Sequence, residues 1–443
     1  MRSHVSRNPW QAKTHTWCVD ATAGAAANCG NAAAPIQTIA TVNALPLRLG
    51  DRVLLKRGET WSGTDMAAPA SGRPGRLITF GAYGSGALPI IIGSAGNNCI
   101  TANGKSHLRF ENLEANANDS CSHGFDVSGD HIYLAGCTAH NATAQNILAY
   151  GAAATVHDIV IASTISYSGA EQGIFFGAAA APGPVNVELL NLTVYSNGTD
   201  TSQHHGIYVQ RCTNSRVADC ISYSNSGCGI GTNGVIDSIF ERNRLYSNNV
   251  GFQDGGSDDP THGNIWRNNL SYSNARNATY AGSNASSSFW YHNTLVNGSS
   301  RGFYHYGSGA TGLVMRNNVI RQDGAVVGIW GVYPVYFLET ADMADTVQDN
   351  NCILYDDTGN GDTVGTEVPD ASYTWAEFQA LGHGPEANGI NVDPVFVTEF
   401  TDLHLQVTSP CSGEGATGLG VVADYDSVVR GSPPDIGALE YVA

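Results

Sequence analysis

The sequence predicts an all-β solenoid, a parallel β-helix in which short strands stack coil upon coil. From about residue 75 onward, short β-rich segments with alternating apolar residues are separated by Gly, Asn and Ser. Helical periodicity is almost absent from this region. A Tyr-Ser phrase returns after 28, 28, 23 and 26 residues, a period too short for propeller blades and without the helix of a leucine-rich repeat.

Two phrases alternate along the repeats. The Tyr-Ser phrase begins at Tyr167, Tyr195, Tyr223, Tyr246 and Tyr272, and in the last four cases Asn197, Asn225, Asn248 and Asn274 follow. The other phrase is a glycine before an apolar residue, at Gly124, Gly173, Gly206, Gly229, Gly251 and Gly302. We expect the apolar residues after glycine to stack inside the coil, and the asparagines to form a hydrogen-bonded ladder.

The chain is expected to divide into four regions. Residues 1–15 are leader-like or tag-like, and residues 16–65 form an N-terminal cap and the first strands, with a short helix around Ile36 to Ala44. Residues 66–345 form the β-helix. Residues 346–443 contain a loop, a short helix around Tyr373 to Leu381 and closing strands, and we expect the last fifty residues to close the open end of the stack.

Composition excludes several partners. The chain has 21 basic and 39 acidic residues, so nucleic acid and anionic membrane surfaces would be repelled. The sequence contains no run of about 18 apolar residues, so no membrane span is expected. A monomer is expected. No lysine follows Lys105, which excludes a lysine base in the middle of the chain. Cys18 with Cys29 and Cys99 with Cys121 are candidates for local disulfides, with buried free thiols as the alternative.

Several motifs resemble the right-handed parallel β-helix proteins of the pectate-lyase-like superfamily. They are GDRVLLKRGETWSG at residues 50–63, Arg-Asn-Asn at 267–269 and 316–318, and the closing segments at 393–394, 403–405, 409–410 and 434–438. The resemblance covers nearly the whole chain and implies a single-stranded right-handed β-helix, together with a secreted, cell-surface or periplasmic location. That superfamily includes polysaccharide lyases, glycoside hydrolases and sugar epimerases, so the fold does not choose the reaction.

Equivalent positions in successive coils should form outward columns about 4.8 Å apart. Two residues past the repeated glycine, the column contains Asp126, Phe175, Tyr208, Gly231, Gln253 and Tyr304. Four residues past it are Gln210, Asn233 and Tyr306, and immediately before it are His123, Gln172, His205, Cys228 and Arg301. Aromatic rings and amides suit a polysaccharide lying along the stack, although the same residues could be ordinary exposed ladders.

The best candidate for catalysis is His204, His205, Tyr208 and Arg211. The histidines are candidates for a base and its neighbour, and Tyr208 for a proton donor or second base. Arg211 is the only Lys or Arg between Arg109 and Arg216 and is expected to neutralise a substrate carboxylate. Uronate β-elimination needs these functions, because the charge that develops beside the carboxylate must be stabilised.

A second cluster runs from Gln253 to His262. We predict Asp254 as a catalytic residue and, as substrate contacts, the residues Glu171, Phe175, Gln210, Asn233, Gln253, Asp258, Asp259, His262, Tyr304 and Tyr306. The acids could bind a bridging Ca²⁺ or could be the paired carboxylates of a glycoside hydrolase with Glu171 or Asp200 as partner. A polar turn without chemistry is the alternative.

A calcium loop is the third candidate site. Asp356, Thr358, Asn360, Asp362 and Glu367 have the spacing of the ligands in such a loop, with Thr in place of the usual acid at the third position and without two flanking helices. The alternative is a polar loop. No organic cofactor is expected.

Three functions remain open on the sequence. Polysaccharide lysis by β-elimination is favoured by the His-His-x-x-Tyr-x-x-Arg group, glycoside hydrolysis is the alternative, and a non-catalytic glycan-binding β-helix is the second alternative. The net charge of −18 favours a neutral glycan unless calcium screens it.

Overall fold

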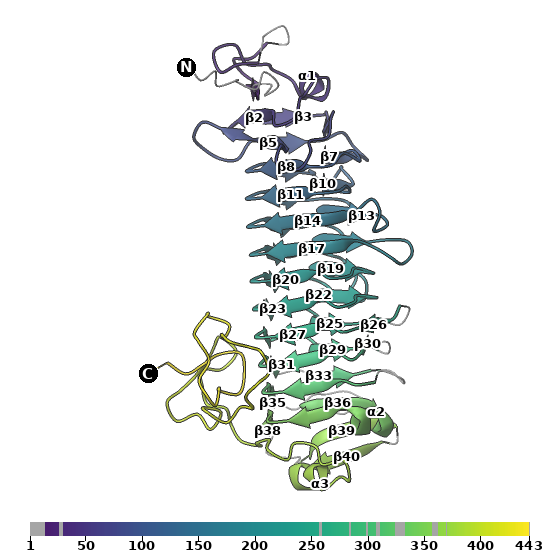
Figure 1. Cartoon of the computed structure of the whole chain (residues 1–443), viewed down its shortest axis with the longest axis vertical. Helices are drawn as coiled ribbons and strands as arrows, with labels where there is room; N and C mark the ends of the chain where they lie inside the picture. Colours follow the sequence, from purple (N-terminus) through teal and green to yellow (C-terminus); the bar gives the residue numbers. More distant parts are fainter. Residues whose placement is uncertain are drawn as a thin grey trace, which may run out of the picture.

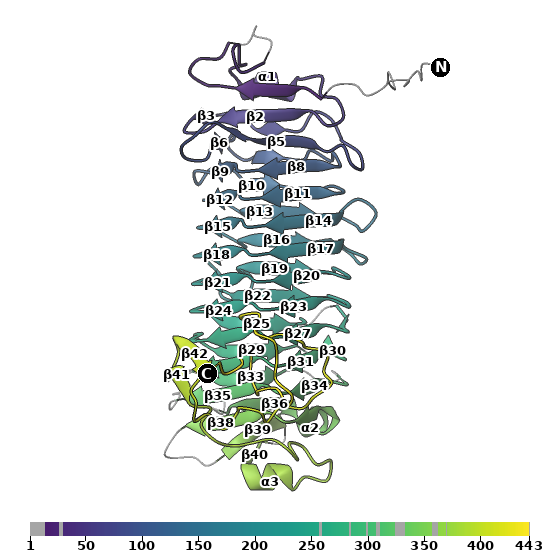
Figure 2. The same cartoon turned by 60° about the vertical axis from the view of Figure 1, so that its left-hand side comes forward.

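The computed structural model describes residues 14–25, 30–256, 259–282, 285–297, 300–306, 311–323, 333–356, 362–368 and 370–442. These residues wind into a stack of coils in which three long sheets run the length of the molecule (Figures 1 and 2). Strands of successive coils pair in parallel, so the predicted parallel β-helix is confirmed.

The strands of the three sheets follow one another in each coil. Sheet I contains β1 (Thr16–Val19), β2 (Arg52–Lys56), β5 (Ile78–Tyr83), β8 (Leu108–Glu111), β11 (Ile132–Ala135), β14 (His157–Ala162), β17 (Val185–Leu190), β20 (Arg216–Ala218), β23 (Ile239–Glu241), β27 (Ile265–Arg267), β31 (Phe289–Tyr291), β34 (Val314–Arg316) and β37 (Val347–Asp349). Sheet II contains β3 (Thr60–Ser62), β6 (Ile90–Ile92), β9 (Glu114–Asn116), β12 (Thr138–His140), β15 (Ile165–Tyr167), β18 (Thr193–Tyr195), β21 (Ile221–Tyr223), β24 (Arg244–Tyr246), β28 (Leu270–Tyr272), β32 (Thr294–Asn297), β35 (Val319–Asp323) and β38 (Cys352–Asp356). Sheet III contains β4 (Met66–Ala67), β7 (Asn98–Thr101), β10 (His123–Asp126), β13 (Ile147–Tyr150), β16 (Ile174–Gly177), β19 (Ile207–Gln210), β22 (Cys228–Asn233), β25 (Val250–Asp254), β29 (Asn277–Ala281), β33 (Arg301–His305), β36 (Val335–Glu339), β39 (Asp362–Val368) and β40 (Ala371–Thr374).

In the described part of the chain, two short strand pairs and three helices lie outside the three long sheets. Two further strand pairs are β26 (Thr261–His262) with β30 (Ala285–Ser286), and β41 (Phe396–Thr398) with β42 (Asp402–Leu405). Helix α1 (Ile39–Asn43) lies at the N-terminal end of the stack, where the sequence predicted a helix, and α3 (Trp375–Gln379) lies within the second predicted helix. Helix α2 (Thr340–Asp345) was not predicted. None of the helices in the described residues is long and apolar enough to cross a membrane.

The core is built from columns of like residues. In sheet III, Ile174, Ile207, Ile230 and Phe252 pair in register and are fully buried, which confirms the inward column expected from the glycine phrase. Period-2 alternation explains it, because the residue after each repeated glycine points into the coil. Behind it, the Trp266 and Trp290 rings of sheet I stack with centroids 4.9 Å apart.

Asparagine ladders bind the coils at two turns. The side-chain amide of Asn197 donates to Asn225 and that of Asn225 to Asn248, both at 3.0 Å, as the Tyr-Ser-Asn phrase predicted. On the outer face beside this ladder, the tyrosines of the phrase stack, with Tyr195 and Tyr223 centroids 5.0 Å apart. The coils joined by this ladder therefore satisfy buried polar groups at the turn with the side chain of the next coil.

The Arg-Asn-Asn phrase supplies the second ladder. Its last asparagine is buried, so that Asn269 donates to Asn293 at 2.9 Å and Asn318 to Asn351 at 2.9 Å. The ladder ends on Glu386, a carboxylate with no exposed surface that accepts from the Asn351 amide at 2.6 Å. The first asparagine of the phrase points outward, and Asn268 donates to the Ala423 carbonyl at 2.7 Å.

The last fifty residues cover the flank of sheet II, and this differs from the expectation that they close the open end. In Figure 1 this segment lies beside the C-terminal coils, whereas β39, β40 and α3 form the end itself. The reason is the outer face of sheet II, where Leu270, Val319 and Cys352 occupy outward positions and are buried. Apolar residues of the segment cover them, including Phe396, Leu403, Leu405, Ile436 and Leu439.

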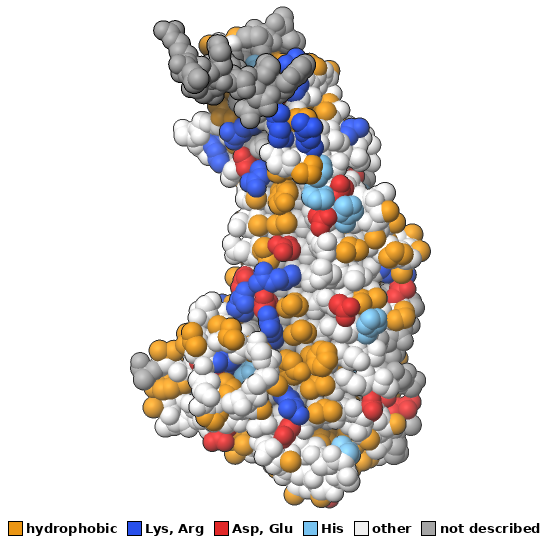
Figure 3. Space-filling view, viewed as in Figure 1, with side chains coloured by type: hydrophobic (Ala, Val, Ile, Leu, Met, Phe, Trp, Pro, Cys, Tyr) orange, Lys and Arg blue, Asp and Glu red, His pale blue; other side chains and the backbone are white. Residues whose placement is uncertain are grey.

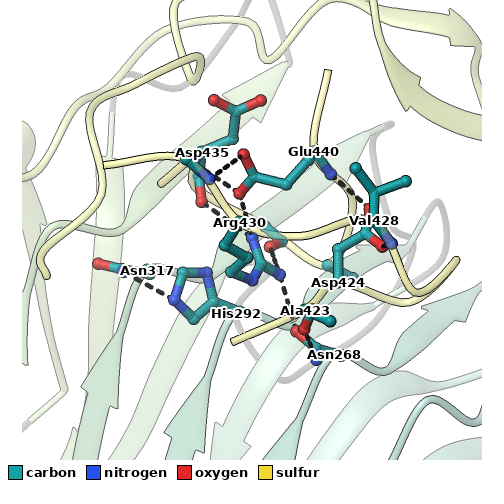
Figure 4. A network of polar contacts seen from close by, with 12 residues as sticks. Asn268, His292, Asn317, Ala423, Asp424, Val428, Arg430, Asp435 and Glu440 are labelled. Carbon is teal, nitrogen blue, oxygen red and sulfur yellow. Dashed lines mark hydrogen bonds and ion pairs between the residues drawn. The ribbon is translucent and has the colours of Figure 1, made fainter. Parts of the chain in front are cut away.

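A buried polar network holds this segment to the stack (Figure 4). The Arg430 guanidinium donates to Asn268 Oδ1 at 2.7 Å and to Glu440 Oε1 at 2.7 Å. Asp424 Oδ2 accepts from the Glu440 backbone amide at 2.8 Å. The ion pair is surrounded by hydrogen bonds, which offset the cost of burying two charges.

The described cysteines are buried free thiols, so Cys99 and Cys121 follow the free-thiol alternative. Cys29 lies outside the described residues.

Candidate functional site

The strands of sheet III lie one above another along the stack (Figure 2), and their outward positions form the predicted column. Phe175 pairs in register with Tyr208, Tyr208 with Gly231, and Gly231 with Gln253. Two positions were missed from the sequence. Leu148 fills the register position between Asp126 and Phe175, and Tyr280 fills the one between Gln253 and Tyr304.

His205 lies on this face but is only 4 % exposed. Its Nδ1 accepts the backbone N–H of Cys228 at 3.0 Å, so the proton of the neutral ring is on Nε2. The ring lies against Gly231, where a Cβ would come within 3.0 Å of His205 Cδ2. Burial lowers the pKa of His205 to about 4. Its imidazole is therefore a neutral hydrogen-bond donor at neutral pH rather than a ready base.

His204 points into a different environment. Its Nδ1 accepts the backbone N–H groups of Thr199 and Asp200, both at 3.2 Å, and so holds the turn before β19. The Asp200 carboxylate is used within the same turn, where it accepts from the Ser202 hydroxyl at 2.7 Å. The structure does not bring His204 or Asp200 onto the column with Tyr208.

Tyr208 is half-buried between its neighbours on the face. Its ring stacks on Phe175 with centroids 5.3 Å apart at 18° and lies 4.8 Å from the His205 ring. Burial is the main cause that raises the pKa of Tyr208, which keeps the phenol protonated at neutral pH. Asn233 and Gln210 pair in register on β22 and β19 and line the same face.

Arg211 follows β19 in the left-handed backbone region, with φ 56°. Its Nη1 donates to the Ala178 carbonyl at 2.7 Å, and its Nη2 lies 2.6 Å from Asp259 Oδ2. The side chains are only 18 % and 20 % exposed. The guanidinium therefore already holds a carboxylate, one supplied by the chain.

Asp254 does not lie on the face, which corrects the prediction that it is catalytic. It has no exposed surface and its Oδ1 accepts from the Asn264 amide at 3.1 Å inside the coil. Burial raises the pKa of this carboxyl. The alternation of β25 explains its position, because Phe252 and Asp254 share the inward face while Gln253 points outward.

The remaining residues of the second cluster are dispersed. Gln253 Oε1 accepts from the Cys228 thiol at 3.2 Å, which keeps it on the face. His262 is exposed on β26 and pairs with Ile236 in the turn between sheets III and I, away from the column. Asp258 lies outside the described residues. Glu171 is half-buried and accepts a hydrogen bond from Gln145.

Tyrosines dominate the C-terminal half of the face. Tyr306 stacks on Tyr280 with centroids 5.7 Å apart, and Tyr304 lies 5.6 Å from Tyr336. The Arg301 guanidinium lies 4.2 Å from the Tyr304 ring centroid, within cation–π range. Tyr304 is 8 % exposed and Tyr306 43 %, so Tyr306 is the more accessible of the two predicted contacts.

A hollow of about 500 Å³ opens at the N-terminal end of the same face, lined in part by Asn98, His123 and Asp126. His123 Nδ1 pairs with Asn98 at 2.7 Å and Nε2 with Gln145 at 2.9 Å. Burial is the main cause that lowers the pKa of His123. A polar chain therefore continues from this hollow toward Gln145 and Glu171.

A larger hollow, of about 750 Å³, lies on sheet I and is lined in part by Asp158, Glu188 and Arg216. Its arginine is engaged, because Arg216 pairs with Glu241 at 2.6 Å. Figure 3 shows Lys, Arg, Asp and Glu side chains gathered on this side of the stack. The buried His205 and the half-buried Tyr208 of the predicted group lie on sheet III instead. Titratable groups whose pKa is shifted by burial mark functional sites more often than satisfied surface ion pairs.

The ligands of the predicted calcium loop lie in the part of the chain whose side chains the structure does not describe. Thr358 and Asn360 lie outside the described residues, as do the side chains of Asp356, Asp362 and Glu367. Calcium there stays a prediction.

Comparison with known proteins agrees with this architecture. Residues 172–337 match the family described as the right-handed β-helix region. The solved structure of pectate lyase Pel9A is similar with a TM-score of 0.61 and 18% identity over 97% of both chains. XylC in complex with xylose gives a TM-score of 0.59 and 12% identity over 96% of this chain and 98% of that one.

A lacto-N-biosidase of family GH136 from Eubacterium ramulus gives a TM-score of 0.50 and 15% identity over 71% of this chain and 68% of that one. A search of curated proteins by sequence found no match. The chain thus has the right-handed parallel β-helix fold, and the fold that the resemblance of its motifs implied is confirmed. At these identities the likeness concerns the fold.

Proposed function

We propose that the chain is a carbohydrate-active enzyme that binds a polysaccharide along the outer face of sheet III and cleaves it there. The single observation that carries this proposal is the arrangement around Gly231, where His205, Tyr208 and Arg211 lie beside a column of rings and amides that is open at the glycine. Stacked rings suit the apolar faces of sugars, and Gln210, Asn233 and Gln253 suit hydroxyl groups. The structures of a pectate lyase and of a xylose complex with the same fold agree with a glycan.

We further propose β-elimination on a uronate-containing polymer. The Arg211–Asp259 pair, at 2.6 Å, supports a site in which a substrate carboxylate takes the place of Asp259. The released Asp259 carboxylate would then be a proton acceptor beside the sugar. Tyr208, whose pKa burial raises, would donate its proton to the leaving oxygen, and His205 Nε2–H would stabilise developing charge.

Glycoside hydrolysis is less well supported by the described residues. Such a reaction uses two carboxyl groups that face each other across the scissile bond. Asp254 is inside the coil, Asp200 is used in its own turn and Glu171 is bonded to Gln145. We also propose a secreted, cell-surface or periplasmic location, because an enzyme would encounter polysaccharide substrates there.

An activity panel tests the proposal. The protein is incubated with pectate, alginate and xylan, and ultraviolet absorbance of an unsaturated uronate is recorded beside reducing ends. We expect both signals to rise together on a uronate polymer. Reducing ends without absorbance would overturn elimination in favour of hydrolysis, and binding without either signal would overturn catalysis.

Tyr208→Phe tests the assigned proton donor. Loss of the hydroxyl should lower kcat on the responsive polymer by about 100-fold or more while the ring stack with Phe175 remains. Tyr223→Phe is the matched control, since Tyr223 stacks between Tyr195 and Tyr246 on sheet II. Equal activity of the two variants would remove Tyr208 from the mechanism.

A further inference from the structure

Four side chains from two successive coils converge at the start of β11 and β14. They are Asp130 and His131 from one coil and His157 and Asp158 from the next, and their ligating atoms all lie within 4.8 Å of one another. Asp130 and His157 form a bridge between the coils. Histidine and acidic side chains gather at this level in Figure 3.

Within the group, His131 Nδ1 is hydrogen-bonded with Asp130 Oδ1 and His157 Nδ1 with Asp158 Oδ2, and the ligating atoms of all four side chains also lie close enough together to share one ion. His157 Nδ1 lies 2.7 Å from Asp158 Oδ2 and 3.1 Å from Asp130 Oδ1, so one ring nitrogen faces two carboxylates. His131 Nε2 lies 3.7 Å from the same Asp158 oxygen. Ligand atoms about 2.1 Å from a tetrahedral metal are about 3.4 Å apart, so small adjustments would seat an ion among them.

The charge of the two carboxylates and the orientation of Asp158 also favour a bound cation. Within the described residues, neither Lys nor Arg pairs with Asp130 or Asp158, so the imidazoles are the only basic groups that pair with the two carboxylates. Asn186 donates to Asp158 Oδ1 at 2.8 Å, which turns Oδ2 toward the group as supporting residues of metal sites do. The four side chains are 29–37% exposed, so an ion has access from solvent and keeps room for water.

We propose that Asp130, His131, His157 and Asp158 form a binding site for a divalent transition-metal ion such as Zn²⁺. Two imidazole nitrogens with two carboxylate oxygens suit Zn²⁺ or Co²⁺ and not Ca²⁺ or Mg²⁺, which prefer oxygen ligands. The ion joins two successive coils and borders the hollow on sheet I, since Asp158 also lines that hollow. The proposal is independent of the one made for sheet III.

Metal titration tests the proposal. Tag-free, metal-free protein is titrated with Zn²⁺ by calorimetry and with Co²⁺ by visible absorption, and its thermal midpoint is recorded with and without Zn²⁺. We expect one strong site per chain, a Co²⁺ spectrum with nitrogen and oxygen ligands, and a higher midpoint with Zn²⁺ because the ion binds only the folded chain.

His157→Ala should weaken Zn²⁺ binding by at least about 100-fold and abolish the midpoint shift. His404→Ala is the matched control, because His404 also lies between two carboxylates, at 2.5 Å from Asp402 and 2.7 Å from Asp426. Asp158→Asn repeats the test with volume preserved should His157→Ala fold poorly. Absence of a strong site in the wild-type protein, or equal binding by both histidine variants, would overturn the proposal.

Discussion

At Gly231 the missing side chain gives the His205 ring its place on sheet III. A Cβ at this position would lie 3.0 Å from His205 Cδ2 and 3.1 Å from Cγ, closer than ordinary packing allows. The same gap separates Tyr208 from Gln253 along the column, so one coil offers an open position between a phenol and an amide. Gly231 lies within strand β22 and not at a turn, so glycine is needed here for the space that it leaves beside His205 and not for its backbone conformation.

Gly231→Ala should therefore impair catalysis with little effect on the fold. The added methyl group pushes the His205 ring by a few tenths of an ångström, and displacements of this kind cost about 10-fold to 100-fold in rate. We expect kcat/KM to fall by at least about 10-fold with the thermal midpoint nearly unchanged. Unchanged kcat/KM would show that the position of His205 is irrelevant to the reaction.

The end of the second asparagine ladder makes stability depend on pH. Burial raises the pKa of Glu386 from 4.5 to about 8. Below about pH 4.5 the carboxyl is protonated in both the folded and the unfolded chain, and its full contribution to the free energy of unfolding is present. Between 4.5 and 8 the unfolded chain loses the proton while the folded chain keeps it, so the free energy of unfolding falls, by roughly 3–5 kcal/mol in total.

Glutamine resembles the protonated acid, so Glu386→Gln should remove this pH-dependent fall in the free energy of unfolding. Denaturant unfolding at pH 5 and pH 8.5 measures it in the wild-type protein, in the variant and in Glu188→Gln, a control at an exposed carboxylate. An identical decline in all three proteins would show that Glu386 is not the group responsible.

The C-terminal segment is joined to the coil stack by one buried arginine in addition to its apolar contacts. Arg430 connects Asn268 of the coil stack with Glu440 of the segment. Arg430→Ala leaves Glu440 buried without its partner, which should cost about 3–5 kcal/mol and loosen the segment from sheet II. Limited proteolysis should then cut within residues 393–442 more quickly.

Arg52→Ala is the control for this prediction. Arg52 pairs with Glu111 at 3.3 Å, and its own side chain is 49% exposed; such surface pairs contribute about 1 kcal/mol or less. Equal proteolysis rates for the two arginine variants would contradict a special role for Arg430.

Across the whole molecule, the repeats predicted the coil and much of the sheet III face, because one register governs every turn. Leu148 and Tyr280 were missed because Asn146 and Ala278 replace the glycine that marked the neighbouring coils. Asp254 was misplaced although strand alternation puts it inside with Phe252. The group at Asp130 and His157 could not be seen in sequence, since it depends on where a 27-residue coil returns.

The flank position of the last fifty residues was also beyond the sequence, because their apolar residues suit either the end or the side of the stack. Which surface they cover is decided by the outward apolar residues of β28, β35 and β38.

We expect the substrate to lie along sheet III at Gly231. A crystal structure of Tyr208→Phe with an oligosaccharide of the responsive polymer would show where the sugar binds. We predict sugar rings along the column of Phe175, residue 208 and Gln253, with a carboxylate on Arg211 where the polymer is a uronate. An oligosaccharide bound in the sheet I hollow beside Arg216, with sheet III empty, would contradict the account.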